Sequence, residues 1–340
     1  MTPSAVHSDA IPPASDLGNV PSEFAELVSG CGLFDLSSRA KIALTGSDRV
    51  RWLNGMVTNN IRDLAVGRGI YAFLLNPQGH ILGDMYAYIR GESLTLDTDQ
   101  SQLEKLLAIF DRYIIMDDVE VSNPTDRMPS IAIAGPKAST VLRSAGFEFP
   151  PLEPLQFADV TWQNAQVTLV RGDHPGIEWY EFWLAPEQLS ALKHALTQAG
   201  AKPAGTAALE LLRVAAGIPR YGQDIRERDL PQETSQDRAL HFSKGCYVGQ
   251  ETVERATAHG SLKKRLCGLR IAGARIPVAG SAILLQGKEI GRLTSVGASP
   301  RLGTIGLAIM HHSAWPEGSQ VVIADGGGQT PATVSDLPLR

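Results

Sequence analysis

One cysteine of this chain stands in a sequence that suits a reactive thiol. Residues 241–255 read HFSKGCYVGQETVER, which places Cys246 two residues after Lys244 and between Gly245 and Gly249. A thiol reacts as the thiolate, and its unperturbed pKa of about 8.5 leaves it mostly protonated at neutral pH. The Lys244 charge would favour the thiolate, and the glycines would let a partner approach the sulfur. The pattern predicts Cys246 as a functional thiol supported by Lys244.

Other interpretations of Cys246 stay open. It could be a small buried cysteine in a glycine-bounded turn, because structural cysteines are commonly buried. It could also be a hydrolase nucleophile with His241 or His259, although no oxyanion-hole signature accompanies it. These histidines match no zinc-ligand spacing, so we predict no metal site. One thiol cannot hold an iron–sulfur cluster, which needs four ligands, so any contact with a cluster would be transient and shared.

Two carboxylates interrupt otherwise apolar stretches. Asp84 lies in HILGDMY and Glu181 lies in WYEFWL. A carboxylate in an apolar strand costs free energy unless it has a partner. We therefore expect Asp84 to face a polar cavity and Glu181 to have a polar partner.

Composition and charge limit the class of protein. The chain has 340 residues, 43% of them hydrophobic, and a net charge of −5. This length allows two or three domains. The negative net charge gives no sign of a basic surface that would bind nucleic acid. Cys31, Cys246 and Cys267 form no CxxC pair, which fits a reducing compartment. No apolar run approaches the length of a membrane span, and the N-terminus lacks a secretory signal, so a cytoplasmic protein is expected.

The apolar periodicity predicts an α+β body followed by an all-β domain. Residues 70–90 form a hairpin pattern whose two apolar runs are joined by the turn residues Asn-Pro-Gln-Gly at 76–79. After Gly260, short alternating strands separated by glycines predict a small antiparallel barrel or sandwich. The expected helices lie at 22–30, 47–61, 101–116, 186–200, 206–217 and 250–258. The predicted division is a disordered tail at 1–20, a body at 21–259 and a β domain at 260–340.

Several separated segments carry a family resemblance. Residues 32–61, the 70–90 hairpin, ALELLRVAAGIPRYGQD at 208–224 and GRLTSVGASPRLGTIGLAIM at 291–310 resemble the glycine-cleavage T-protein (aminomethyltransferase) superfamily. KGCYVGQE at 244–251 is similar to the signature of one branch, the YgfZ-type folate-binding proteins. The resemblance implies a three-domain ring, with two α/β subdomains around a central folate hole and a C-terminal antiparallel β-barrel. It also implies tetrahydrofolate, or a one-carbon derivative, as the cofactor.

The resemblance assigns folate-site roles to six residues. It implies that Glu181 clamps the pterin and that Asp84 matches the catalytic aspartate of the transferases. It places Tyr71 and Tyr88 at pocket-lining positions of the hairpin. It places Arg213 and Tyr221 on the helix and turn that meet the folate tail. Each has an ordinary alternative, since Tyr71 and Tyr88 could be strand aromatics, and Arg213 could pair with Glu210 or Asp224.

The resemblance leaves two functions open. The leading one is a tetrahydrofolate-binding accessory protein for iron–sulfur cluster assembly or repair, supporting enzymes that include tRNA-modifying ones, with Cys246 as the functional thiol. Its partners would be folate and cluster-assembly factors or client enzymes, with no direct nucleic acid and no membrane. The alternative is a folate-dependent aminomethyl or methyl transferase using Asp84. Two departures from the transferase pattern, Ser38 in DLSS at 35–38 and GDHPG at 172–176, disfavour it.

Overall fold

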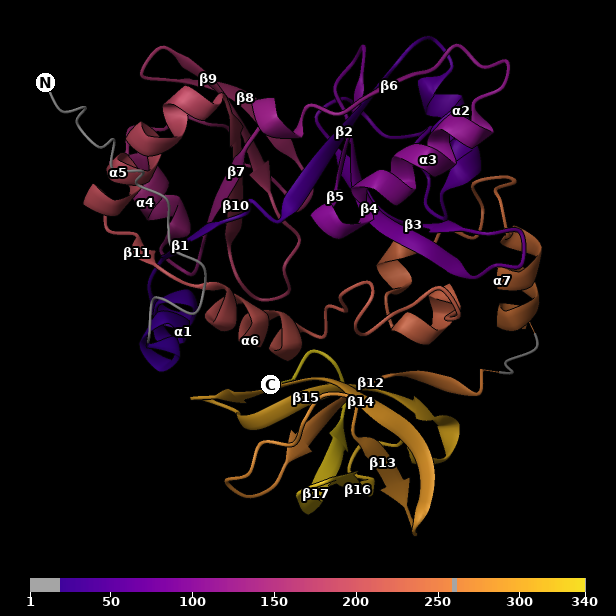
Figure 1. The fold of residues 1–340 in the computed structure, drawn as a ribbon. Helices are drawn as coiled ribbons and strands as arrows, with labels where there is room; N and C mark the ends of the chain where they lie inside the picture. Colours follow the sequence, from indigo (N-terminus) through magenta and orange to yellow (C-terminus); the bar gives the residue numbers. More distant parts are fainter. Residues whose placement is uncertain (1–18, 259–261, 340) are drawn as a thin grey trace, which may run out of the picture. The chain divides into compact units, whose positions relative to one another are not determined.

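The computed structural model describes residues 19–258 and 262–339 (Figure 1). The chain divides into two compact units. The first unit comprises the described residues up to Ser37, together with Asp126–Leu152 and Ala158–Leu209. The second unit comprises Ser38–Thr125, Glu153–Phe157 and the described residues from Glu210 onward. The predicted tail at 1–20 lies almost wholly outside the described residues.

The first unit is a six-stranded sheet with helices packed on one face. Its strand order is β11-β1-β7-β10-β9-β8, with β1 and β11 parallel. Apolar residues from α4 and α5 pack on Ile131, Ile133 and Phe182 of this sheet. The elements are α1 (Val20–Ser29), β1 (Gly32–Asp35), β7 (Ser130–Ala134), α4 (Ala138–Ser144), β8 (Phe157–Trp162), β9 (Ala165–Arg171), β10 (Trp179–Leu184), α5 (Leu189–Gln198), β11 (Lys202–Pro203) and α6 (Thr206–Ala216), of which β8 and α6 continue into the second unit.

The second unit contains a five-stranded antiparallel sheet in the order β3-β4-β5-β2-β6. Two helices cover one face, where Trp52, Phe110 and their neighbours form a core with Leu74, Met85 and Leu96 (Figure 1). The elements are β2 (Arg39–Thr45), α2 (Arg49–Met56), β3 (Gly69–Leu75), β4 (Ile81–Ile89), β5 (Leu94–Asp99), α3 (Leu103–Tyr113), β6 (Glu120–Ser122) and α7 (Gln250–Ala258).

The C-terminal part of the second unit is a closed six-stranded barrel in the order β12-β15-β14-β13-β16-β17. Leu269, Ile283, Leu293 and Ile323 belong to its apolar interior. The strands are β12 (Lys264–Ile271), β13 (Ala282–Leu285), β14 (Lys288–Ser299), β15 (Gly303–His311), β16 (Gln320–Asp325) and β17 (Gly328–Ser335). The prediction of an α+β body followed by an antiparallel β-barrel is confirmed. No described helix has the length and apolar character that a membrane crossing requires.

The predicted helix at 47–61 ends early, at Met56. Val57 is extended and forms a β-bridge with Leu74. The side chain of Asn54 accepts a hydrogen bond from the Ile61 amide at 3.0 Å. The Asn54 side chain and the bridge to Leu74 thus form hydrogen bonds with backbone groups that would pair within the helix if it continued.

Candidate functional site

One face of the second-unit sheet carries most of the predicted site residues. In a strand, alternate side chains point to the same face. Met85 and Ala87 pack into the helix-covered core, so Asp84, Tyr86 and Tyr88 lie on the opposite face. Across the ladder, Tyr71 stands opposite Tyr86. The hairpin thus brings Tyr71 and Asp84 to one surface, which we call the site face.

Both oxygens of the Asp84 carboxylate accept hydrogen bonds from protein donors. The Tyr71 hydroxyl donates to Oδ2 at 2.6 Å, and Nε2 of Gln102 donates to Oδ1 at 2.6 Å. The Gln102 side-chain oxygen also accepts from the Asp84 amide at 3.0 Å, so one amide group holds both the backbone and the side chain. Thr98 donates to the Asp84 carbonyl at 2.8 Å. Asp84 thus has polar protein partners and a fixed orientation, while the polar cavity expected in front of it stays a prediction.

Tyr71 is held in its neutral, hydrogen-donating form. Burial and the neighbouring Asp84 raise the pKa of Tyr71 well above its usual value, although Arg238 opposes them. The Arg238 guanidinium lies 4.4 Å from the centre of the Tyr71 ring, which is a cation–π geometry. Asn59 donates to the Tyr71 carbonyl at 2.8 Å. The site face therefore has a phenol that donates and a cation beside its ring.

Tyr221 lies near the same carboxylate. Its hydroxyl accepts a 2.8 Å hydrogen bond from Lys105, whose ammonium also pairs with Glu227. Burial raises the pKa of Tyr221, and the charge of Asp84 contributes in the same direction although Lys105 opposes it. Tyr221 is thus a neutral phenol at the edge of the Tyr71–Asp84 pair.

The Tyr88 side chain is packed closely against other residues of the second unit. Its side chain is buried, and its ring lies 6.0 Å from that of Phe157 in an edge-on arrangement. A Cβ placed on Gly69 would lie 2.4 Å from the Tyr88 ring. These contacts favour the alternative in which Tyr88 is a structural strand aromatic, and its pocket-lining role stays a prediction.

Glu181 lies in the first unit, on the sheet face that α4 and α5 leave uncovered. The indole of Trp179 donates to Oε1 at 3.0 Å, and that of Trp183 donates to Oε2 at 3.3 Å. The expectation of a polar partner is confirmed. The two indoles fix the orientation of the Glu181 carboxylate. The pterin clamp stays a prediction.

The alternative role proposed for Arg213 is confirmed, since it pairs with both acids. Nε and Nη2 donate to Glu210. Nη1 donates to Asp224 at 2.7 Å and to the Ile218 carbonyl at 2.6 Å. Nη2 also donates to Ser295 at 2.7 Å. These bonds use all five donors of a guanidinium, so Arg213 has none left for a folate carboxylate in this structure.

Lys244 points into the protein. Its ammonium is buried and donates to the carbonyls of Asn54 and of Val57, the latter at 2.6 Å. Burial, with a smaller contribution from Arg62, lowers the pKa of Lys244 to about 8. The observed contacts of Lys244 hold the 244–251 segment on α2, so the expectation that its charge acts on Cys246 receives no support from them.

Cys246 is exposed, whereas Cys31 and Cys267 are buried. The interpretation of Cys246 as a buried structural cysteine is therefore wrong. The loop around it is fixed on both sides, because Lys244 contacts α2 and Val248 donates its amide to Gly55 at 3.1 Å. The predicted helix follows at Gln250–Ala258. The loop presents the sulfur to solvent on an anchored backbone.

Two members of the site were missed by the sequence reasoning. Gln102 lies in a 3₁₀ turn after β5, and Arg238 lies in a 3₁₀ turn far along the chain. Neither stands in a motif. Only folding brings them to Asp84 and Tyr71, so no local sequence signal could have identified them.

The chemistry of the site suits part of a tetrahydrofolate molecule. A pterin offers donors that match carboxylate acceptors, and aromatic faces match its flat ring. Asp84 is such an acceptor in the second unit, and Glu181 is such an acceptor in the first unit. Tyr71 is such an aromatic, but its side chain is as buried as that of Tyr88, so its pocket-lining role likewise stays a prediction. The predicted tail contact does not fit, because Arg213 is committed to Glu210 and Asp224. The residues present thus fit the pterin end better than the glutamate end.

The chain combines two sheets, each packed with helices, and a C-terminal β-barrel, and this fold is known from other proteins. A crystal structure of aminomethyltransferase T of the glycine cleavage system, from Bartonella henselae, superposes with a TM-score of 0.86 at 23% identity, covering 94% of this chain and 89% of that one. The family model for the GCVT N-terminal domain matches residues 14–244, and that for the glycine cleavage T-protein C-terminal barrel domain matches residues 264–339. The chain therefore belongs to the glycine cleavage T-protein family.

Curated relatives span nearly the whole chain. An aminomethyltransferase of Rubrobacter xylanophilus is 31% identical over 94% of this chain and 86% of its own length. A putative chloroplastic transferase of Arabidopsis thaliana is 26% identical over 91% of this chain and 71% of its own length. Folate binding and one-carbon transfer are thus supported at the level of the family.

Proposed function

We propose that this protein binds tetrahydrofolate and transfers a one-carbon unit with Asp84 as the working carboxylate. The observation that supports this is the fixed orientation of Asp84, whose two oxygens accept from Tyr71 and Gln102 at 2.6 Å. Relatives named aminomethyltransferase support the reaction class.

The roles follow from the contacts. Bound tetrahydrofolate would supply the nitrogens that carry the one-carbon unit. Asp84 orients the reacting group and accepts its proton, because a carboxylate held on both oxygens keeps its position while charge develops. Tyr71 donates to Asp84 and stabilises its charge. Glu181 binds the donor edge of the pterin, and Tyr221 contacts the folate tail.

The test is a transfer assay with tetrahydrofolate and a panel of aminomethyl donors, whose carbon is already at the oxidation level of methylene-tetrahydrofolate. Wild type is expected to form methylene-tetrahydrofolate from one of them. Asp84→Asn should retain folate binding and lose at least about 100-fold in rate, which is the lower end of what positioned acid–base groups contribute. Equal rates for wild type and Asp84→Asn would contradict the role of Asp84.

A second candidate function rests on Cys246. Its exposure, the anchored loop and the KGCYVGQE segment support a YgfZ-type accessory role in iron–sulfur cluster assembly or repair, with folate as a ligand. The departures DLSS and GDHPG from the transferase pattern support it as well. Its partners would be cluster-assembly factors or cluster-containing client enzymes.

Complementation separates the two candidates. In a strain lacking the protein, the activities of cluster-containing enzymes are measured after supplying wild type, Cys246→Ala or Asp84→Asn. The accessory role predicts rescue by Asp84→Asn and loss of rescue with Cys246→Ala. Equal rescue by wild type and Cys246→Ala would leave the thiol without this function.

A further inference from the structure

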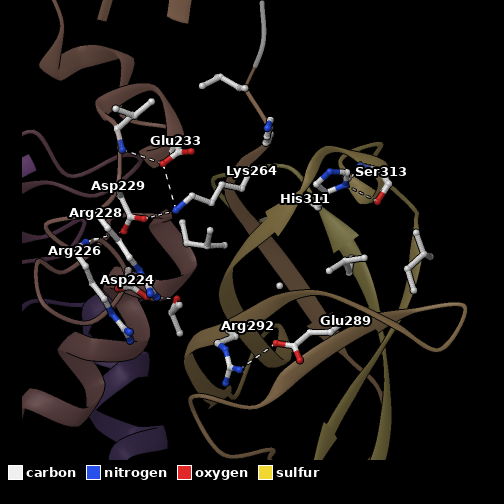
Figure 2. A pocket seen from close by; sticks show the side chains of 18 of the residues that line it. Asp224, Arg226, Arg228, Asp229, Glu233, Lys264, Glu289, Arg292, His311 and Ser313 are labelled. Carbon is white, nitrogen blue, oxygen red and sulfur yellow. Dashed lines mark hydrogen bonds and ion pairs between the residues drawn. The ribbon is translucent and has the colours of Figure 1, made fainter. Parts of the chain in front are cut away.

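A separate cavity of about 1040 Å³ lies wholly within the second unit (Figure 2). Its lining comes from the loop after Tyr221, from one residue of α7 and from the barrel strands β12 to β15. Figure 2 shows Asp224, Arg226, Arg228 and Asp229 on the loop, and Glu289, Arg292 and His311 on the barrel. The described lining includes none of the residues assigned to folate above, so the cavity is distinct from the site face.

The acidic side chains of this cavity already have cationic partners. Asp229 and Glu233 both contact the Lys264 ammonium, at 2.5 and 3.4 Å (Figure 2). The two other acids pair with arginines, since Asp224 contacts Arg213 at 2.7 Å and Glu289 contacts Arg292 at 3.1 Å. Asp229 and Glu233 share the single charge of Lys264, and the six Lys and Arg side chains of the lining outnumber its four carboxylates by two.

Four cations of the lining have no carboxylate partner among the described residues: Arg226, Arg228, Lys263 and Lys288. All four are exposed. Desolvation and the charges of His312, Lys288 and Lys263 lower the pKa of the neighbouring His311, which places these lysines close to it. A cavity with excess positive charge in a chain of net charge −5 attracts anions.

The same cavity also has an apolar wall. Leu230, Leu262, Leu285, Ile290 and Ile309 belong to its lining. Ligand sites of this size combine an apolar surface with a few polar groups that fix orientation. An inorganic anion would use only the cations, whereas a ligand with an apolar body and a charged group would use both.

We propose that this cavity binds an amphipathic small-molecule anion, with its charged group on Arg226, Arg228, Lys263 and Lys288 and its apolar body on the leucine and isoleucine wall. This inference is independent of the proposed function, because it uses no residue assigned to folate.

The test uses the full chain and 1-anilinonaphthalene-8-sulfonate, a probe with an aromatic body and one sulfonate. Titration followed by fluorescence should show one saturable site that weakens with added salt, because exposed charges are screened. The Arg228→Gln/Lys288→Gln double variant is expected to bind about tenfold more weakly, since it loses two charged donors. The Lys202→Gln/Arg301→Gln variant removes two exposed cations outside the cavity and should bind as wild type does.

Three outcomes would overturn the proposal. These are the absence of saturable binding to wild type, equal weakening in both double variants, and stoichiometric displacement of the probe by tetrahydrofolate. Unchanged thermal melting of both variants establishes that they are folded. Failure of the transfer assay would leave this result unaffected, so the two proposals are tested separately.

Discussion

At the scale of single residues, Asp84 and Cys246 occupy opposite kinds of environment. Asp84 is enclosed by donors on both oxygens, so its orientation is set before any ligand arrives. Cys246 has an exposed side chain on an anchored loop, so its accessibility is set by the backbone. The first arrangement suits a group that works inside a pocket, and the second suits a thiol that meets a partner.

The three cysteines are expected to differ sharply in reactivity. Burial raises the pKa of Cys31 to about 12 and also raises the pKa of Cys267. Alkylation of the folded protein at pH 7.5 should therefore modify Cys246 alone, and Cys246→Ala should remain unmodified over the same time. Peptide mapping by mass spectrometry measures this. Comparable rates for Cys31 or Cys267 in the folded protein would contradict the burial described here.

At the scale of elements, the 244–251 loop is held against the β3–β4 turn. Gly249 has φ +83, and a Cβ on it would lie 2.5 Å from the Asn76 carbonyl oxygen. Gly249→Ala therefore combines left-handed strain with a backbone clash and should lower the free energy of unfolding by more than about 3 kcal/mol. Gly91 has φ +72 with open space around its Cβ position, so Gly91→Ala is a control that should lose only about 1 kcal/mol. Chemical denaturation measures both, and equal losses would refute the predicted clash.

The sheet beside the site contains a buried ion cluster. Asp97 accepts from Lys41 at 2.7 Å and from Arg39 at 2.8 Å, and Lys41 and Asp97 are fully buried. Asp97→Asn should lower the free energy of unfolding by about 3–5 kcal/mol, because it removes the carboxylate charge that pairs with the buried Lys41.

This loss should depend on pH. Burial alone would raise the pKa of Asp97, but Arg39 and Lys41 lower it below its usual value. The Asp97 contribution is therefore complete above the unfolded pKa of about 3.9 and disappears as the pH falls through the lower folded value. Denaturation at several pH values should show a constant difference between wild type and Asp97→Asn above about pH 5, narrowing below about pH 4. A difference that widens in acid would contradict this assignment.

At the scale of the whole molecule, Arg213 shows how the barrel is joined to the rest of the second unit. Its guanidinium connects α6 to Asp224, and Asp224 accepts from Thr294 at 2.5 Å and Ser295 at 2.7 Å of β14. Asp224 is buried, so Arg213→Ala should lower the free energy of unfolding by about 3–5 kcal/mol. At temperatures where the variant stays folded, its tetrahydrofolate affinity should equal that of wild type. A large loss of affinity in the folded variant would restore the tail-binding role of Arg213.

Much of the fold could be predicted from the sequence, but less of the site. Periodicity and turn residues identified the hairpin, the helix at 206–216 and the barrel, because these patterns are local. The interrupted apolar strand correctly indicated that Glu181 needs a polar partner, and it also drew attention to Asp84. The partners themselves, Gln102 for one and the indoles for the other, depend on side-chain directions that no linear pattern carries. The contacts of Lys244 were unpredictable for the same reason, because its position two residues before Cys246 does not reveal that its ammonium donates to the carbonyls of Asn54 and Val57.

Folate binding is the claim on which both candidate functions depend, and an anaerobic titration with tetrahydrofolate tests it most directly. Wild type is expected to bind at one saturable site, and Glu181→Ala should bind more weakly by about 1–3 kcal/mol, since a pterin donor pair loses its acceptor. Glu187→Ala removes an exposed carboxylate from the same unit and should bind as wild type does. Absence of saturable binding to wild type, or equal affinity in wild type and Glu181→Ala, would contradict the account.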